Sequence, residues 1–503
     1  MARWSPTVTF DGGDLDCGSG LLLLIRQHLD PLREGELLEI RSTEISVDED
    51  LPAWCRMTRN ELVSQEKKGR QSRFFVAKGS FVPPKTVPAP TESPVRTKAP
   101  LPRPVVAVAE PGPLPDPAPA PVIPRLAVTG IGSWPRPRWL LAAMHQHLQG
   151  QLTDDAFEET ADDAVRLAVR AQVEAGVDVL TDGEQRRDNY ASFVGAKLQN
   201  CQLVPIVDLL PYVDDPAAFR AELDALDVPA EQVRHPAVFG RLGRDRALAV
   251  HELRFVQTLS DRPTKVALPG PYLLTRTMWM ECISDRAYAD REALAVDLVA
   301  VLRQEIAALL AAGASLVQLD EPVLSEVVFG SPSRQRSFMC GAIGERKDAG
   351  AELGFAEELL RATTEGFPRE RLALHVCRGN WSPDESVALR GDYGPLLPFL
   401  SRAPVGALLL EACTDRAGDV ALLRAIPEDR RLGVGLVNQK LEVIEPFESV
   451  LPRARRAVEM FGSDRLILHP DCGFATFADN PIASARVAAG KLAVLARVAA
   501  ALR

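Results

Sequence analysis

The sequence is poor in cysteine and long hydrophobic runs, and it has no excess of basic residues. Eight cysteines are scattered over 503 residues, too sparsely for a disulfide scaffold, and such a pattern indicates a reducing compartment. No apolar run approaches the ~20 residues of a membrane-spanning helix, and the first ten residues lack the apolar segment of a signal peptide. The net charge of −10 argues against general nucleic-acid binding. We therefore expect a cytoplasmic protein with neither a membrane nor a nucleic-acid partner.

Proline, by contrast, is concentrated in one segment. From Ser80 to Pro124, 15 of 45 residues are proline, and a segment so poor in backbone donors is expected to be an extended, semi-rigid linker. It predicts a division into a small domain of residues 1–79, a linker of residues 80–124 and a large domain of residues 125–503. A passive spacer is the simpler interpretation, with a role as a ligand for proline-binding modules as the alternative.

The small domain shows the element order β-α-β-α-β-β. Strands are expected at 7–10 and 37–43, helices at 18–29 and 50–58, and a hairpin at 61–66 and 73–77 across a basic turn. This order predicts a two-layer α/β sandwich.

The large domain repeats one hydrophobic pattern eight times. Short apolar runs end in polar or glycine residues, and helical patterns usually follow them. Eight such strands predict a (β/α)8 TIM barrel, whose functional residues lie at the C-terminal ends of the strands. The runs are 126–129, 177–181, 264–268, 316–319, 371–376, 405–410, 432–437 and 465–468.

A histidine and a cysteine follow one another at the end of the fifth run. His375 and Cys377 are two residues apart, so on a strand both side chains point to one face. The next run ends at Glu411 and the eighth leads to Cys472. Together they offer one nitrogen, two sulfurs and one oxygen, a donor set that suits Zn2+. Alternatively, the His–Cys pair is structural, Cys472 is a buried small hydrophobe and Glu411 caps the next helix.

In these motifs the sequence from about residue 126 onward resembles the C-terminal catalytic half of cobalamin-independent methionine synthase. The motifs occur in the family's order over about three quarters of the chain. They are Gly130-Ile131-Gly132-Ser133, Asp182-Gly183-Glu184, Leu319-Asp320-Glu321-Pro322, His375-Val376-Cys377, Glu411 and Pro470-Asp471-Cys472-Gly473.

The resemblance implies a zinc-dependent thiol methyltransferase whose acceptor is homocysteine. It implies that Glu411, the weaker oxygen ligand, yields to the substrate sulfur, which then attacks an electrophilic methyl group. It further implies four residues for the acceptor: the ammonium lies between Glu184 and Asp320, and the carboxylate lies near Ile131 and Ser133.

The sequence departs from the family on the side of the methyl donor. The 503 residues show a single barrel pattern, whereas the full-length enzymes carry a second, N-terminal barrel. Where the family has an Asp and a His that assist proton transfer, this chain has Asn438 and Lys440. We therefore expect that the methyl donor is not the ordinary polyglutamyl folate; methyltetrahydrofolate and a methyl-corrinoid protein are the two candidates. Another zinc-dependent thiol alkyltransferase, of the epoxyalkane:coenzyme M transferase kind, is the alternative.

The small domain resembles the TusA family of sulfur carriers. The resemblance rests on the element order, the segment Glu49-Asp50-Leu51-Pro52-Ala53-Trp54-Cys55 and the position of Cys17. It implies that Cys17, at a helix start, is a reactive thiol. The family's Cys-Pro-x-Pro motif reads Cys17-Gly18-Ser19-Gly20 here. A sulfur-relay protein and a docking domain with Cys17 and Cys55 as packing residues both stay open.

Overall fold

The protein forms two compact units, which we describe separately. The structure is a computed structural model. It describes residues 6–13, 15, 21–58, 60–68, 71–81, 105–110, 112–148, 151–205, 234–280, 284, 286–330, 348–380 and 382–503. The first unit comprises residues 1–103 and 207–211, and the second comprises residues 104–206 and 212–503. Cys17 lies outside the described residues.

The first unit has the predicted element order. Its sheet has the strand order β1-β2-β4-β3, with β1 and β2 parallel and the other pairs antiparallel. The elements are β1 (Val8–Asp11), α1 (Leu22–Leu29), β2 (Leu37–Ser42), α2 (Val47–Thr58), β3 (Glu61–Lys68) and β4 (Gln71–Ala77). The prediction of a small N-terminal sheet domain is confirmed.

One face of this sheet forms a core with both helices. The register places Leu38 opposite Val76 and Ile40 opposite Phe74, so alternate residues of two strands present one apolar surface. Trp54 and Cys55 of α2, together with residues of α1, pack in the same cluster. These contacts make the two-layer arrangement that the sequence predicts.

The second unit is built on parallel strands that close into a barrel. Seven of them form a sheet in the order β5-β13-β12-β11-β10-β9-β8. The remaining predicted strand, 177–181, fills the gap through the bridges Thr129–Val179 and Leu180–Thr264. The strands are β5 (Ala127–Val128), β8 (Lys265–Pro269), β9 (Leu316–Asp320), β10 (Leu372–Val376), β11 (Ala407–Leu410), β12 (Arg431–Val437) and β13 (Leu466–Pro470). All eight predicted runs therefore belong to the barrel.

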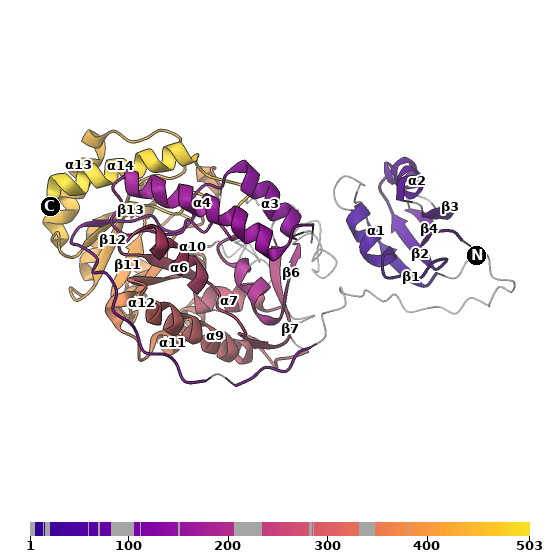
Figure 1. The fold of residues 1–503 in the computed structure, drawn as a ribbon, viewed down its shortest axis with the longest axis horizontal. Helices are drawn as coiled ribbons and strands as arrows, with labels where there is room; N and C mark the ends of the chain where they lie inside the picture. The colour runs from indigo at the N-terminus through magenta and orange to yellow at the C-terminus, as the bar shows by residue number, and fades with distance from the viewer. Residues whose placement is uncertain are drawn as a thin grey trace. The chain divides into compact units, whose positions relative to one another are not determined.

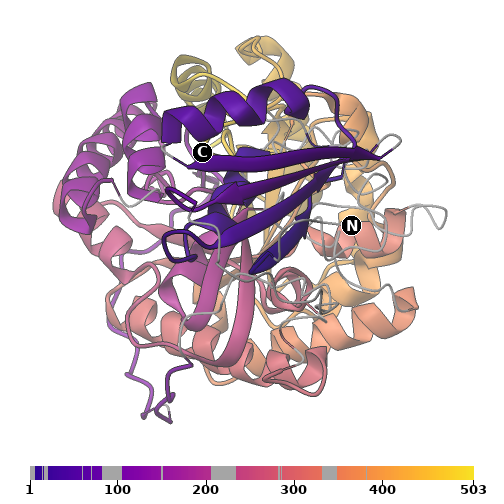
Figure 2. The same ribbon diagram turned by 90° about the vertical axis from the view of Figure 1, so that its right-hand side faces the viewer.

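Helices surround these strands (Figures 1 and 2). Because parallel strands are covered on both faces, every residue of β8, β9, β10, β11 and β13 is buried. The helices are α3 (Arg138–Leu148), α4 (Asp154–Glu174), α6 (Val250–Leu259), α7 (Pro271–Met278), α9 (Arg291–Ala311), α10 (Val323–Phe329), α11 (Ala349–Thr364), α12 (Leu397–Arg402), α13 (Phe447–Phe461) and α14 (Ala485–Leu502).

Several of the longer helices begin at side-chain caps. The side chains of Thr153, Asp290, Asp348 and Ser484 accept hydrogen bonds from backbone N–H groups in the first turns of α4, α9, α11 and α14. Such caps satisfy donors that have no partner within the helix. The chain thus marks where these barrel helices start with short polar residues.

An antiparallel hairpin interrupts the barrel pattern. It consists of β6 (Gln199–Pro205) and β7 (Arg234–Gly243) and was not predicted. Its strands mix buried and partly exposed positions without strict alternation, so the period-two signal of a strand is weak.

Part of the proline-rich segment belongs to the second unit and packs on its barrel. Arg371 donates to the carbonyl of Ala118 at 2.6 Å, and Ser315 donates to the carbonyl of Pro121 at 2.8 Å. Ile123 packs against the cluster inside the barrel formed by Ile131, Leu316, Ala373, Ala407, Leu409 and Ile467. We call residues 112–124 the strap.

The helices among the described residues are all too short or too polar to cross a lipid bilayer.

Candidate active site

A pocket lies at the C-terminal ends of the barrel strands. Its lining brings together loops that follow five strands, as expected for a site built on this fold. Seven of the residues predicted for the site line it: Ile131, Ser133, Glu184, Asp320, His375, Cys377 and Cys472. Tyr190, Pro322, Gly379, Asn380, Gly473 and Thr476 form the rest of the wall.

Three of the four predicted metal ligands converge in this pocket. One ligand atom each of His375, Cys377 and Cys472 lies within 4.8 Å of the others, and all three residues are buried. Ligands held at about 2.0–2.3 Å from a zinc ion lie within that separation of one another. The three side chains can therefore hold one ion. They come from the end of β10 and the loop after β13, strands that are far apart in the sheet order.

The two thiols are hydrogen-bonded to each other. The hydrogen bond from Cys472 lowers the pKa of Cys377, although burial opposes its ionisation. The same hydrogen bond and burial raise the pKa of Cys472 well above its ordinary value. Cys377 is thus the first of the pair to become a thiolate, the form that binds metals.

His375 is oriented by a carboxylate. Its Nδ1 lies 3.0 Å from Asp320 Oδ1, while its Nε2 is buried with no hydrogen-bond partner among the described residues. Burial opposes protonation of the ring, but the hydrogen bond and charge of Asp320 raise the pKa of His375. A histidine held by a carboxylate on one nitrogen, with the other free, has the arrangement of a metal-ligating histidine.

The fourth predicted ligand, Glu411, is held by protein groups. It is fully buried, and Oε1 accepts hydrogen bonds from the backbone of Arg378 at 2.7 Å and from the amide of Asn380. Arg416 lies 3.2 Å from Oε2. Glu411 is close enough for its charge to raise the pKa values of both thiols. It is not one of the three residues in the converging group.

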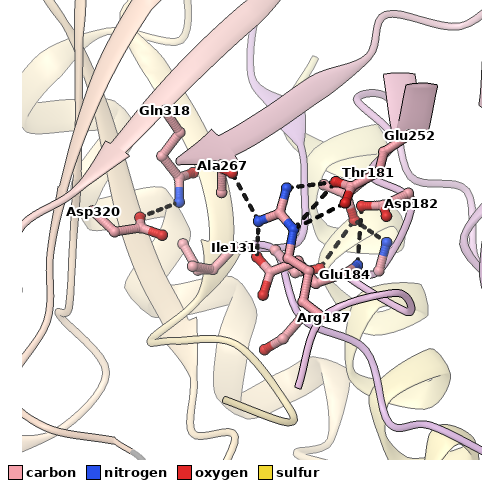
Figure 3. A network of polar contacts seen from close by, with 12 residues as sticks. Ile131, Thr181, Asp182, Glu184, Arg187, Glu252, Ala267, Gln318 and Asp320 are labelled. Carbon is pink, nitrogen blue, oxygen red and sulfur yellow. Dashed lines mark hydrogen bonds and ion pairs between the residues drawn. The ribbon is translucent and has the colours of Figure 1, made fainter. Parts of the chain in front are cut away.

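Glu184 enters the pocket from the loop after the second strand (Figure 3). Its φ is +54°, an unusual value for a residue with a side chain, and its N–H donates to Asp182 Oδ1 at 3.0 Å. Oε2 is buried without a hydrogen-bond partner in the described part of the chain. Burial raises the pKa of Glu184 to about 7, with Arg187 opposing the rise and Asp320 adding to it.

Arg187 provides the countercharge behind Glu184. It is buried and bonds Glu252 on α6 at 2.6 Å and the carbonyl of Ala267 at 2.9 Å; its Nη1 lies 3.9 Å from Glu184 Oε1 (Figure 3). Burial disfavours its charge, but Glu252 and Glu184 more than offset that and raise its pKa. The positive charge of Arg187 therefore stabilises the ionised form of Glu184 in the pocket.

Ser133 closes the pocket on the side of the first strand. Its hydroxyl accepts a hydrogen bond from Ala475 N–H at 3.3 Å, and its carbonyl accepts one from Phe474 N–H at 3.1 Å. A Cβ atom on Gly473 would lie 2.2 Å from the Ser133 hydroxyl, so this approach requires glycine. The loops after β5 and β13 thereby pack directly together.

Sequence reasoning missed a lysine inside the barrel. Lys265, at the start of β8, is 1% exposed. Its Nζ donates to the carbonyls of Gly130 and Ile131 and to Gln318 Oε1. Burial lowers the pKa of Lys265 to about 7, with Asp320 and Glu184 opposing the shift. A lysine at the edge of an apolar run is usually exposed, so the sequence held no clear signal of this role.

The predicted proton-transfer residues bind neighbouring loops. Lys440 Nζ donates to the carbonyls of Ser382 and Asp384 at 2.7 and 2.9 Å, and burial lowers its pKa. Asn438 donates to Glu385 at 2.6 Å. Neither Lys440 nor Asn438 is among the described residues that line the pocket.

The large unit matches one protein family over most of its length. The family described as "Cobalamin-independent synthase, Catalytic domain" matches residues 126–209 and 217–493. A methionine synthase of Sulfolobus acidocaldarius is 28% identical over 349 residues, which cover 69% of this chain and 85% of that protein. A methionine synthase of Saccharolobus solfataricus is 25% identical over 352 residues, which cover 70% of this chain and 89% of that protein.

Solved structures share the fold of this unit. A B12-independent methionine synthase from Shewanella sp. W3-18-1, in complex with selenomethionine, superposes with a TM-score of 0.57 at 23% identity, covering 76% of this chain and 98% of that one. A putative vitamin-B12 independent methionine synthase from Listeria monocytogenes gives a TM-score of 0.54 at 18% identity, covering 77% and 99%. The expected barrel fold is confirmed by these matches.

Proposed function

The chain belongs to the cobalamin-independent synthase catalytic-domain family and is a methyltransferase enzyme, and from this premise we propose that it methylates the sulfur of homocysteine at a zinc site. The observation that carries the proposal is the convergence of His375, Cys377 and Cys472 at the pocket. Homocysteine is the thiol acceptor in this proposal because relatives 25–28% identical to the chain are methionine synthases.

The three converging residues would hold the zinc ion, with Glu411 as the fourth and weakest ligand. The buried, unpartnered His375 Nε2 and the lowered pKa of Cys377 support this assignment. Glu411 must exchange contacts with Arg378 and Arg416 to reach the ion, so we expect it to be the ligand that the substrate replaces. A zinc ion held there would lower the pKa of an incoming thiol, which then reacts as a thiolate.

The carboxylates of Glu184 and Asp320 would bind the acceptor's ammonium. Both side chains line the pocket together with the three ligand residues, and charge-assisted hydrogen bonds would fix the orientation of a small amino acid there. The first βα loop, with Ile131 and Ser133, would receive its carboxylate. Orienting both reactants would supply much of the acceleration.

Metal analysis combined with an activity assay tests this proposal. Cys472→Ser should lose most of its zinc and lower the rate of methionine formation by more than the ~10–100-fold typical of losing an outer metal partner. Cys413→Ser is the matched control, because Cys413 bonds Asp471 at 2.8 Å and lies outside the converging group. A Cys472→Ser variant with full zinc and full activity would contradict the metal site. A zinc-loaded protein that leaves homocysteine unmethylated with both candidate donors would contradict the function.

The methyl donor is either methyltetrahydrofolate or a methyl-corrinoid protein in this proposal. Lys440 and Asn438 occupy the positions of the family's proton-transfer residues, yet Lys440 is bound to two carbonyls. We favour the corrinoid donor because an ammonium held in this way is a poor proton donor to a folate. Methyl transfer to homocysteine should be faster from methylcobalamin than from methyltetrahydrofolate, and the opposite order would contradict this preference.

We also propose that the first unit is a TusA-like domain with Cys17 as its reactive thiol. Its β1-β2-β4-β3 sheet with two helices supports the assignment. Cys55 is 1% exposed within the core of this unit, so it serves as an internal reference. Alkylation followed by mass spectrometry should modify Cys17 much faster than Cys55; equal rates would favour a docking domain with two packing cysteines.

A further inference from the structure

The buried cation at the centre of the barrel has no part in the function proposed so far. Lys265 Nζ donates to Gly130 O at 2.6 Å, to Ile131 O at 2.8 Å and to Gln318 Oε1 at 2.6 Å. An ammonium has three hydrogens and no acceptor. In its protonated form Lys265 therefore has one acceptor for each of its three hydrogens, as a buried polar group requires.

This arrangement determines which way the Gln318 amide points. The protonated Lys265 can only donate, so it requires the amide oxygen of Gln318 on its side. The amide nitrogen is thereby directed to Asp320, where Nε2 donates to Oδ1 at 2.6 Å (Figure 3). Without the ammonium, the amide could rotate and turn its oxygen toward the carboxylate.

Asp320 is the residue whose geometry depends on that amide. Its Oδ1 accepts from Gln318 and also lies 3.0 Å from His375 Nδ1, and neither of these contacts is made by Oδ2. Two partners on one oxygen fix the plane of the carboxylate while the residue lines the pocket. The contacts of Lys265 with Gly130 and Ile131 attach the first βα loop to the same cation.

We propose that Lys265 and Gln318 are positioning residues for the acceptor site, which hold Asp320 in the orientation that binds the acceptor's ammonium. This inference rests on the proposed function, since it assumes a thiol acceptor that carries an ammonium group. Neither residue lines the pocket among the described residues, so both act through Asp320.

A packing role for the same residues would have a different signature. If Lys265 and Gln318 only filled the barrel, their loss would weaken every ligand of the pocket to a similar degree. If they orient Asp320, their loss should weaken the binding of ligands that carry an ammonium and leave the binding of other ligands unchanged. The informative comparison is between homocysteine and 4-mercaptobutanoate, which has the same thiol and carboxylate but lacks the amino group.

The sharpest variant is Gln318→Glu. It preserves the shape of the side chain and gives Lys265 a carboxylate to bind, so the fold is supported, but it replaces the donor to Asp320 by an acceptor. In the zinc-loaded full-length protein, the KM for homocysteine should rise about tenfold, while kcat and the inhibition constant of 4-mercaptobutanoate change little. Lys265→Met should likewise raise the ratio of the KM for homocysteine to the inhibition constant of 4-mercaptobutanoate.

The control is Arg371→Met, which removes a cation bound to the carbonyls of Ala118, Leu310 and Ala314 at the N-terminal end of β10. It should leave the ratio of the constants unchanged. Equal weakening of both ligands in Gln318→Glu, or an unchanged KM for homocysteine, would overturn the inference. A wild-type protein that does not methylate homocysteine would overturn the proposed function instead, so the two failures are distinguishable.

Discussion

At the scale of single residues, the pocket depends on carboxylates whose charge is controlled by what surrounds them. Glu184 is buried, with one oxygen unpartnered among the described residues and Arg187 behind the other. Glu411 is equally buried but is bound by two N–H donors and an arginine. One carboxylate is therefore available to a ligand, whereas the other must first release protein partners.

Glu184 should make acceptor binding depend on pH. Burial raises the pKa of Glu184 to about 7, so its carboxyl becomes neutral as the pH falls below that value and loses its attraction for an ammonium. The KM for homocysteine should accordingly rise as the pH is lowered from about 8 to about 6, one unit either side of that pKa. Initial-rate kinetics across this range would measure the effect.

Glu184→Gln is the control for this pH dependence. The amide does not titrate, so the variant should have a high KM for homocysteine that does not show the rise expected of the wild type between about pH 8 and about pH 6. A wild-type KM that is constant across the range, or the same pH profile in the variant, would contradict the assignment of Glu184.

The sequence predicted the residues that end strands and missed those that start them. His375, Cys377 and Cys472 could be found because reactive side chains follow apolar runs at the C-terminal ends of barrel strands. Lys265 could not, because a lysine at the start of an apolar run is normally solvated. The partners of Glu411 were equally hidden, since Arg416 and Asn380 reach it only after the loops have folded.

At the scale of elements, the turn from β8 into α7 is unusually tight. Glu321, next to Asp320, accepts from Tyr272 N–H at 2.8 Å and from Leu273 N–H at 2.9 Å. It thus satisfies two orphan donors in the first turn of α7. Gly270 makes this possible, because a Cβ there would lie 2.2 Å from Glu321 Oε1.

Gly270→Ala should therefore destabilise the barrel. The added methyl group would displace Glu321 from the start of α7, at a cost of about 1–3 kcal/mol in the free energy of unfolding. Thermal or denaturant unfolding would measure it. Gly354→Ala in α11 is the matched control: a Cβ there meets nothing within 4 Å, so the variant should gain about 0.5–1 kcal/mol. Equal stability of the two variants would contradict this account of the turn.

Element boundaries followed from the sequence wherever the hydrophobic pattern was strong. All eight runs of the barrel are strands or bridged segments, although 177–181 is joined only by isolated bridges. The hairpin of β6 and β7 escaped prediction because it departs from the alternating barrel rhythm, and its strands carry Asn200 at positive φ and a register shift next to it. Irregular pairing of this kind leaves little periodicity in the sequence.

At the scale of the whole molecule, the proline-rich segment has two different parts. Residues 1–103 belong to the first unit, together with 207–211, and the strap belongs to the second. Arg431 donates to the carbonyl of Pro124 at 2.6 Å, and Ile123 packs on the apolar residues inside the barrel. Proline suits the strap because it limits the freedom of the unfolded chain and forms no backbone N–H that needs a partner.

Two N-terminal truncations should distinguish the contributions of these two parts to the stability of the barrel. A protein that starts at Pro104 should keep the melting temperature and zinc content of the barrel, because the strap remains. A protein that starts at Arg125 should melt at a lower temperature, since Leu316, Ala373 and Ile467 lose their cover and Arg371 and Arg431 lose carbonyl partners. Calorimetry would measure both; equal melting temperatures would show that the strap contributes no stability.

Two substitutions in the full chain test the same point without truncation. Ile123 is partly buried against the barrel cluster, and Ile123→Ala should lower the free energy of unfolding by about 1–2 kcal/mol, from the loss of buried methyl and methylene groups. Val122 is 88% exposed, so Val122→Ala should change stability by less than about 0.5 kcal/mol. Denaturant unfolding of the barrel would compare them. If both variants have the same free energy of unfolding, the strap is only a spacer. If only Ile123→Ala is destabilised, Ile123 of the proline-rich segment is part of the barrel's apolar core.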